Sequence, residues 1–155
     1  MRTSPTSDGT WAGRTTDAAR RGVLENTRVD WGASGLVKLA SQLVLPLSPE
    51  LLRQRKDFAP FRPGVEIAEL YRDDSSGTSA ALLRYAPGAK VSRHEHAGHE
   101  HILVLEGSQR DERGEYVAGT LIVNPPGTAH SVESPNGCLV LIIWSRPIHF
   151  LGEAD

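Results

Sequence analysis

Four of the chain's six histidines lie within eight residues, from His94 to His101. His94 and His96 are two residues apart, so both side chains leave an extended segment on the same face. Glu100 has the same parity, and His130 follows in a second segment framed by proline and glycine. Imidazole nitrogens and a carboxylate that converge on one point form a site for a first-row metal ion. The sequence therefore predicts a metal centre with His94, His96, Glu100 and His130 as ligands.

His99 and His101 have the opposite parity to the predicted ligands. On a continuous strand their side chains would point away from the metal, toward the surface or a dimer interface. A role beside the site also remains open, because a metal-bound imidazole usually needs a partner on its outer nitrogen.

The segments that must position these residues have the residue pattern of an all-β domain. From Gly64 onward, short runs of alternating or apolar residues are separated by turns rich in Gly, Pro, Asn and Asp, which predicts antiparallel strands. Several short strands with closely spaced turns indicate a sandwich or barrel. The expected strands cover residues 65–71, 79–85, 100–106, 120–123, a segment around His130, and 138–144.

Three details of this pattern are specific enough to check. The strand 100–106 is expected to end at Gly107, and Asp111 to Gly114 marks a hairpin turn. The near-continuous apolar run 138–144 predicts a strand with both faces covered. Its first residue, Cys138, is expected to pack in the core rather than to act as a thiolate.

The N-terminal part of the chain differs in composition. Residues 1–30 are rich in Ser, Thr, Arg, Gly and Asp and show no hydrophobic period, so we expect a disordered tail followed by a single domain over 31–155. Residues 42–47 could form a strand. Ser48, Pro49 and Glu50 predict the start of a short helix that ends before Asp57, with Ser48 as its N-cap.

Composition excludes several classes of function. The chain has 155 residues and a net charge of −2, with no Lys/Arg excess, so nucleic-acid binding is not expected. Its apolar runs are too short to span a membrane. A single cysteine rules out an internal disulfide framework and fits a reducing compartment, so we expect a cytoplasmic protein.

The spacing of glycines and ligands forms two motifs. Gly88 is followed by His94-x-His96, Glu100 and Gly107, and Gly119 is followed by Pro125-x-Gly127 and His130. These segments resemble the paired motifs of the cupin superfamily, with Ser134 standing where the second motif usually ends in asparagine. The fuller string resembles the ChrR-like cupin domain proteins over a motif core of about residues 60–150. It consists of Pro87-Gly88-Ala89, His94-x-His96-x-Gly98-x-Glu100, Val104-Leu105-Glu106-Gly107-Ser108, Asp111-Glu112-x-Gly114 and Asn124-Pro125-Pro126-Gly127-x-x-His130.

The resemblance implies a double-stranded β-helix, a jelly-roll-like barrel, with the four ligands at its mouth. The short helix and the flexible tail would precede the barrel. Similar proteins include a zinc-binding sensor domain of an anti-sigma factor and iron-dependent dioxygenases that cleave small ketones or diketones. They are commonly dimers, so we expect a homodimer. The donor set accepts Fe, Zn, Mn or Ni, and the sequence does not choose among them.

Three functions follow from these expectations. The first is a non-haem dioxygenase, an oxidoreductase in which Glu100 is a fourth metal ligand or an acid–base group, and in which Tyr85 and Trp144 line a pocket for a small-molecule substrate. The alternative is a non-catalytic, metal-dependent ligand-binding or sensing module. Sigma-factor binding of the anti-sigma type is not expected, because residues 1–60 contain no Cys or His for its zinc-binding domain. A purely structural metal is the third reading.

Overall fold

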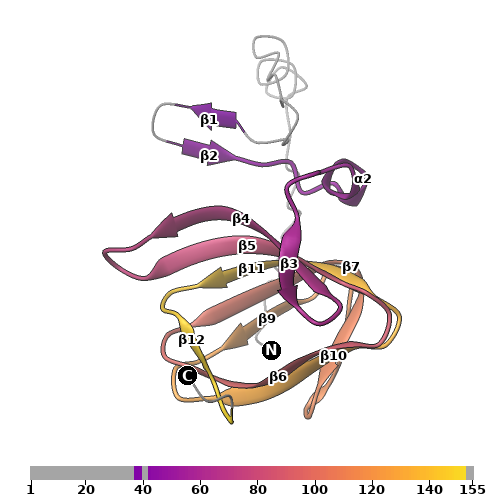
Figure 1. Cartoon of the computed structure of the whole chain (residues 1–155), viewed down its shortest axis with the longest axis vertical. Coiled ribbons are helices and arrows are strands. Elements are labelled where there is room, and N and C mark those ends of the chain that lie inside the picture. The colour runs from indigo at the N-terminus through magenta and orange to yellow at the C-terminus, as the bar shows by residue number, and fades with distance from the viewer. Residues whose placement is uncertain (1–36, 40–41, 153–155) are drawn as a thin grey trace, which may run out of the picture. The chain divides into compact units, whose positions relative to one another are not determined.

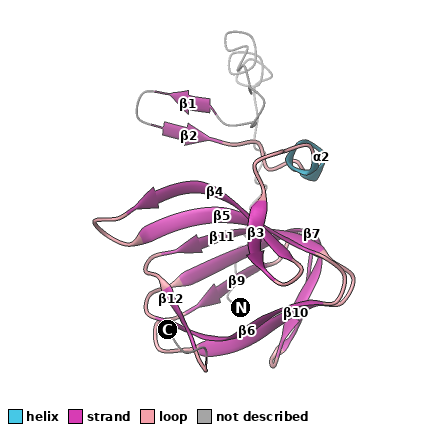
Figure 2. Cartoon of the chain, viewed as in Figure 1, coloured by secondary structure: helices cyan, strands magenta, loops and turns pink. Residues whose placement is uncertain are grey.

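The computed structural model describes residues 37–39 and 42–152. Within them the chain consists of antiparallel strands and one short helix (Figure 2), which confirms the predicted all-β class. The predicted tail over 1–30 lies outside the described residues. The elements are β1 (Val37–Leu39), β2 (Gln42–Val44), α2 (Pro49–Arg53), β3 (Ala59–Arg62), β4 (Val65–Asp73), β5 (Thr78–Tyr85), β6 (Ala89–His96), β7 (Glu100–Asp111), β8 (Gly114–Val117), β9 (Leu121–Asn124), β10 (Ala129–Ser134), β11 (Cys138–Trp144) and β12 (Ile148–Phe150).

Ten of the strands form one curled sheet in the order β12-β6-β10-β7-β11-β5-β4-β3, with β8 and β9 also paired to β7. Figure 1 shows that β4, β5 and β11 form one wall and that β6 and β10 lie across from them. β1 pairs with β2 in a separate two-stranded ladder. The curled antiparallel sheet is the jelly-roll-like barrel that the sequence predicted.

Strand β7 joins the two walls, and here the sequence-based expectation was wrong. The strand does not end at Gly107 but continues to Asp111. Gly107 has a φ of +71°, a conformation that glycine adopts without steric cost and that bends the strand instead of ending it. Before the bend β7 pairs with β11 and β9, and beyond it with β8 and β10.

Strand β11 has apolar neighbours on both faces, as its sequence predicted. Val140 and Ile142 face the main core inside the barrel, where Cys138 is also buried. Leu139 faces outward and packs in a second cluster with Leu52 of α2. The outer face of this wall is therefore covered, and the inner face is available to build the site.

The N-terminal elements are shorter than expected. The strand predicted over 42–47 ends at Val44, and α2 begins at Pro49 as predicted, but the Ser48 side chain makes no capping hydrogen bond. Strands β3 and β12, which the sequence pattern did not reveal, pair with β4 and β6. The single helix of the described residues spans five residues, and no membrane-spanning helix is found there.

Gly107 is a sharp test of this architecture. A Cβ at this position would collide with the carbonyl oxygen of Gly137, and the positive φ adds backbone strain. We expect Gly107→Ala to lower the free energy of unfolding by at least about 2 kcal/mol, measured by urea denaturation. Gly114→Ala is the matched control, because a Cβ there meets nothing within 4 Å. Equal stability of the two variants would contradict the role of the bend.

Candidate metal centre

Three strands bring the predicted ligands to one point inside the barrel. β6 supplies His94 and His96, β7 supplies Glu100, and β10 supplies His130. Each of the four residues is at most 2% exposed, and their potential ligand atoms all lie within 4.8 Å of one another. The sequence-predicted set is thus brought together, and the group could hold a metal ion.

The register of β6 and β10 explains this convergence. His130 lies directly opposite His94 in the ladder, while the next paired residues are Val132 and Val91. Two residues of β6, Ser92 and Arg93, therefore oppose one residue of β10. This bulge shifts the alternation of β6, so that Val91 and His94 both point inward.

A turn at the end of β6 fixes its last histidine. The backbone N–H of Gly127 donates to the carbonyl of His96 at 2.8 Å, and the N–H of His96 donates to the carbonyl of Thr128 at 2.9 Å. The predicted Pro-Pro-Gly turn thus ties the chain before β10 to the end of β6. It holds the two motifs against each other beside the ligands.

Hydrogen bonds to the outer nitrogens set the tautomers of His94 and His96. The Nδ1 of His94 lies 2.9 Å from the carbonyl oxygen of Ser92, which can only accept. The Nδ1 of His96 lies 2.9 Å from Oγ1 of Thr128, whose own proton goes to the carbonyl of Pro125 at 2.6 Å. Both Nδ1 atoms therefore carry a proton, and both Nε2 atoms present a lone pair.

The outer nitrogen of His130 faces a carboxylate. Its Nδ1 lies 3.3 Å from Oδ2 of Asp111, the last residue of β7. Arg113 donates to the same oxygen at 2.7 Å, and the Tyr116 hydroxyl donates to Oδ1 at 3.1 Å. Burial alone would raise the pKa of Asp111, but the bonds from Arg113, His130 and Tyr116 lower it to about 2. The ionised carboxylate accepts a hydrogen bond from Nδ1–H, which leaves the Nε2 lone pair directed inward.

The inward nitrogens are spaced as ligands of a common ion. The Nε2 atoms of His94 and His130 lie 3.1 Å apart, and Nε2 of His96 lies 3.0 Å from Oε2 of Glu100. Atoms bound about 2.1 Å from one ion are about 3.0 Å apart at a right angle and about 3.4 Å apart at the tetrahedral angle. The buried Nε2 of His96 has no hydrogen-bond partner among the described residues, although it lies beside the carboxylate. Three lone pairs and a carboxylate with no proton between them fit a divalent cation.

Glu100 is held in its ionised form by neighbours on both oxygens. The indole N–H of Trp144 donates to Oε1 at 2.8 Å, and the side-chain amide of Asn124 donates to Oε2 at 2.8 Å. These two N–H donors stabilise the ionised form of the buried carboxylate. A carboxylate so placed is suited to binding a cation. Its predicted acid–base role stays a prediction.

Asn124 and Arg113 connect the two carboxylates. Arg113 donates to Oδ1 of Asn124 at 2.8 Å, which turns the amide N–H₂ toward Glu100. Sequence reasoning missed Asp111, Arg113 and Asn124, treating the first two as part of a hairpin turn. One signal was present: Asn124 has the inward parity of Ile122 in its strand, where an apolar residue would be expected.

His99 and His101 do not join the cluster. His99 is exposed, and its ring stacks on that of His101 with centroids 6.2 Å apart. The outer nitrogens of the candidate ligands are bonded to Ser92, Thr128 and Asp111, so neither of these histidines serves them.

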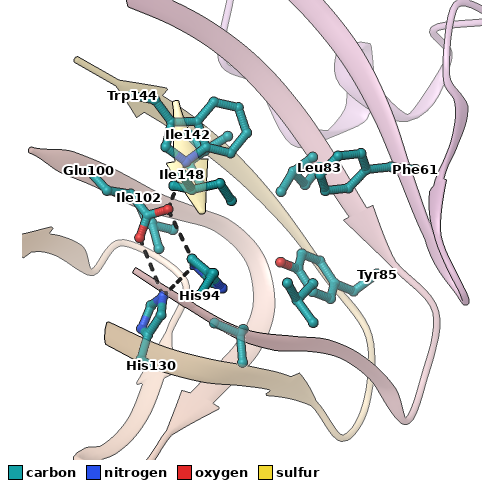
Figure 3. Close-up of a pocket in the computed structure, with 12 residues that line it drawn as sticks. Phe61, Leu83, Tyr85, His94, Glu100, Ile102, His130, Ile142, Trp144 and Ile148 are labelled. Atoms are coloured by element: carbon teal, nitrogen blue, oxygen red, sulfur yellow. Dashed lines mark hydrogen bonds and ion pairs between the residues drawn. The ribbon is translucent and has the colours of Figure 1, made fainter. Parts of the chain in front are cut away.

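Three of the candidate ligands, His94, Glu100 and His130, form one side of a small cavity (Figure 3). Tyr85 and Trp144, the predicted pocket residues, both line it. The cavity volume is about 270 Å³ with its opening, and its enclosed part has room for about one water molecule. The other lining residues are Phe61, Leu83, Val91, Ile102, Val132, Ile142 and Ile148.

The barrel and its inward-facing group of three histidines and a glutamate define a cupin. The chain belongs to the family of the ChrR cupin-like domain, which matches residues 52–147. No curated protein matches the sequence.

Solved structures share the fold at low sequence identity. An acetylacetone dioxygenase from Acinetobacter johnsonii superposes with a TM-score of 0.62 at 16% identity, covering 76% of this chain and 83% of the other. An RmlC-like cupin protein from Ralstonia eutropha gives 0.58 at 22%, covering 63% and 68%. A chain of the complex of SigE with the anti-sigma ChrR from Rhodobacter sphaeroides gives 0.55 at 23%, covering 92% and 70%.

The contact between Asp111 and His130 can be tested through metal affinity. Asp111→Asn removes the charge that holds both Arg113 and His130, so we expect affinity for Zn²⁺ or Fe²⁺ to fall about 10- to 100-fold in a chelator competition. Asp73→Asn is the control, because Asp73 also accepts hydrogen bonds at the end of a strand but from Ser75 and Ser76, outside the centre. Equal affinities of the two variants would argue against an influence of Asp111 on the metal.

Proposed function

We propose that this protein is a metal-dependent dioxygenase that cleaves a small diketone. The observation that carries the proposal is the make-up of the cavity. His94, His130 and Glu100 of the candidate metal cluster form one side, and the remaining walls are mostly apolar. A ligand with two oxygens on an apolar body complements such a site, because its oxygens can reach the metal while its carbon atoms contact aliphatic and aromatic side chains.

The reaction consumes diketone and dioxygen in equal amounts. For 2,4-pentanedione, the bond between a carbonyl carbon and the central carbon breaks together with the O–O bond. One oxygen atom enters each fragment, which gives acetic acid and a 2-oxoaldehyde without an external reductant. A redox-active ion such as Fe²⁺ would supply the electron transfer to dioxygen and a meeting point for the two reactants.

The residues around the cavity would hold the ion, balance its charge and exclude bulk water. His94, His96 and His130 would hold the ion through nitrogens whose protons are fixed on the outer side, and Glu100 would balance its charge. Trp144 and Asn124 keep both oxygens of Glu100 occupied, so the carboxylate keeps its orientation. Buried apolar side chains, including Val91 and Ile142, exclude bulk water from the space beside the ligands.

The narrowness of the cavity makes entry a distinct step. Ten of the lining residues are buried, whereas Phe61 of β3 and Ile148 of β12 are only partly buried. These two side chains therefore mark the entrance. A diketone is several times larger than the single water that the cavity admits, so binding it requires them to move aside.

The fold supports the proposal by analogy. The acetylacetone dioxygenase from Acinetobacter johnsonii has the same fold, and the proposal assigns this chain a reaction of the same class.

A sensing module is the second candidate. It is favoured by the narrow cavity, which suits a small ligand held without turnover, and by the likeness to a chain of the SigE–ChrR complex over 92% of this protein. Such a module would bind its ligand at the same metal without consuming oxygen. The expected homodimer and cytoplasmic location stay predictions in either case.

Oxygen uptake separates the two candidates. We expect protein loaded with Fe²⁺ to consume dioxygen when 2,4-pentanedione is added, in a one-to-one ratio with the diketone, as followed with an oxygen electrode. His96→Ala should lose both the metal and the uptake. Absence of uptake across a panel of diketones, with iron verified in the protein, would reject the enzyme and leave the sensing module.

The entrance can be tested by side-chain removal. Phe61→Ala should lower KM for diketones bulkier than 2,4-pentanedione by about 3- to 10-fold, because less apolar surface must be displaced. Its affinity for the metal should not change. Tyr71→Ala, which removes an exposed aromatic side chain of β4, is the control. A KM that rises for every substrate would show that Phe61 contacts the ligand instead of blocking its path.

A further inference from the structure

The polar groups that line the cavity differ in whether they already have partners. His94, His130 and Glu100 belong to the metal cluster. The indole N–H of Trp144 is used by Glu100 at 2.8 Å. The hydroxyl of Tyr85 makes no hydrogen bond to any residue that the structure describes. Of the two predicted pocket residues, Tyr85 alone thus has a polar atom to offer a ligand.

The position of Tyr85 directs this hydroxyl into the cavity. Tyr85 is the last residue of β5 and lies opposite Val65 and Cys138 in the neighbouring strands. Its side chain is 5% exposed and belongs to the main core. In Figure 3 its hydroxyl points toward the side of the cavity where His94 lies.

The chemistry of this phenol is that of a neutral donor. Burial, followed by the nearby Cys138 and Glu100, raises the pKa of Tyr85 above its usual value, so the hydroxyl keeps its proton. No described residue accepts a hydrogen bond from this hydroxyl, so it is available to donate to a ligand in the cavity.

We propose that the Tyr85 hydroxyl donates a hydrogen bond to an oxygen of the ligand bound beside the metal, and that this bond selects ligands with a carbonyl or carboxylate acceptor. The inference rests on the proposed function for its substrate class and specifies how that class is recognised. Metal ligands on one side and one phenol on the other orient a ligand, and the apolar walls between them accept its carbon body. Trp144 has a different task, because its N–H positions Glu100.

The experiment compares ligand binding in wild type and Tyr85→Phe. Both proteins are loaded with Co²⁺, and 2,4-pentanedione or azide is titrated without oxygen while the visible absorption of the ion is followed. We expect Tyr85→Phe to raise the Kd of 2,4-pentanedione about 2- to 10-fold, the loss of one neutral hydrogen bond. Its cobalt content should match that of wild type, because Tyr85 contacts none of the four candidate ligands through a hydrogen bond.

Thermal unfolding distinguishes a ligand-binding hydroxyl from a structural one. The ligand-free melting temperature of Tyr85→Phe should equal or exceed that of wild type, since no internal hydrogen bond is lost. Tyr71→Phe is the matched control: the same substitution on the exposed face of β4 should leave both Kd and melting temperature unchanged. Tyr85→Met serves as a second variant and should weaken diketone binding likewise.

The outcomes separate this inference from the proposed function. Diketone binding of equal strength in wild type and Tyr85→Phe would overturn the role of Tyr85 while the dioxygenase proposal stands. A lower melting temperature with unchanged Kd would overturn it in favour of a structural hydroxyl. If wild type binds azide in a Tyr85-dependent way but binds no diketone, the hydroxyl's role is supported and the diketone substrate is rejected.

Discussion

The structure depends on the close approach of three imidazoles and one carboxylate in the interior of the barrel. Three imidazole nitrogens and a carboxylate face one another within 4.8 Å, all at most 2% exposed. Groups of this kind repel one another unless a cation lies among them. The surrounding chain fixes this arrangement, because oxygens of Ser92, Thr128 and Asp111 each accept a hydrogen bond from the outer nitrogen of one ring. The bulge in β6, the turn before β10 and the bend of β7 all serve this orientation.

Local sequence spacing predicted the ligands because strand parity is a local property. His94 and His96 needed only an extended segment, and the glycine-framed motif around His130 placed the third imidazole. The residues that hydrogen-bond to the candidate ligands, such as Asp111, could not be predicted from the sequence for a physical reason. Asp111 meets His130 only because β7 passes through Gly107 without ending, and the sequence pattern indicated that a strand stops there. Strands β3 and β12, which carry the entrance residues, were too short and irregular to be recognised.

The different roles of the two aromatic pocket residues, Tyr85 and Trp144, also could not be predicted from local sequence. Sequence placed Tyr85 and Trp144 beside the cavity as equivalent candidates. Register distinguishes them: Trp144 pairs with Glu100 across β11 and β7, so its N–H is committed to the carboxylate, whereas Tyr85 pairs with Cys138 and Val65, which offer it no acceptor side chain. Strand register, which depends on contacts between distant segments, thus decides which of the two aromatic residues can still offer a hydrogen bond to a ligand.

Strand β7 begins with Glu100 and ends with Asp111, and both carboxylates approach the same ring. Glu100 lies 3.4 Å from Nε2 of His130, and Asp111 lies 3.3 Å from its Nδ1. One imidazole is thus clamped between the two ends of a single strand. The clamp requires both the bend of β7 and the pairing of β10, so the four groups come together through contacts between distant parts of the chain. An ion held by all four would therefore stabilise the completed barrel over any partly folded form.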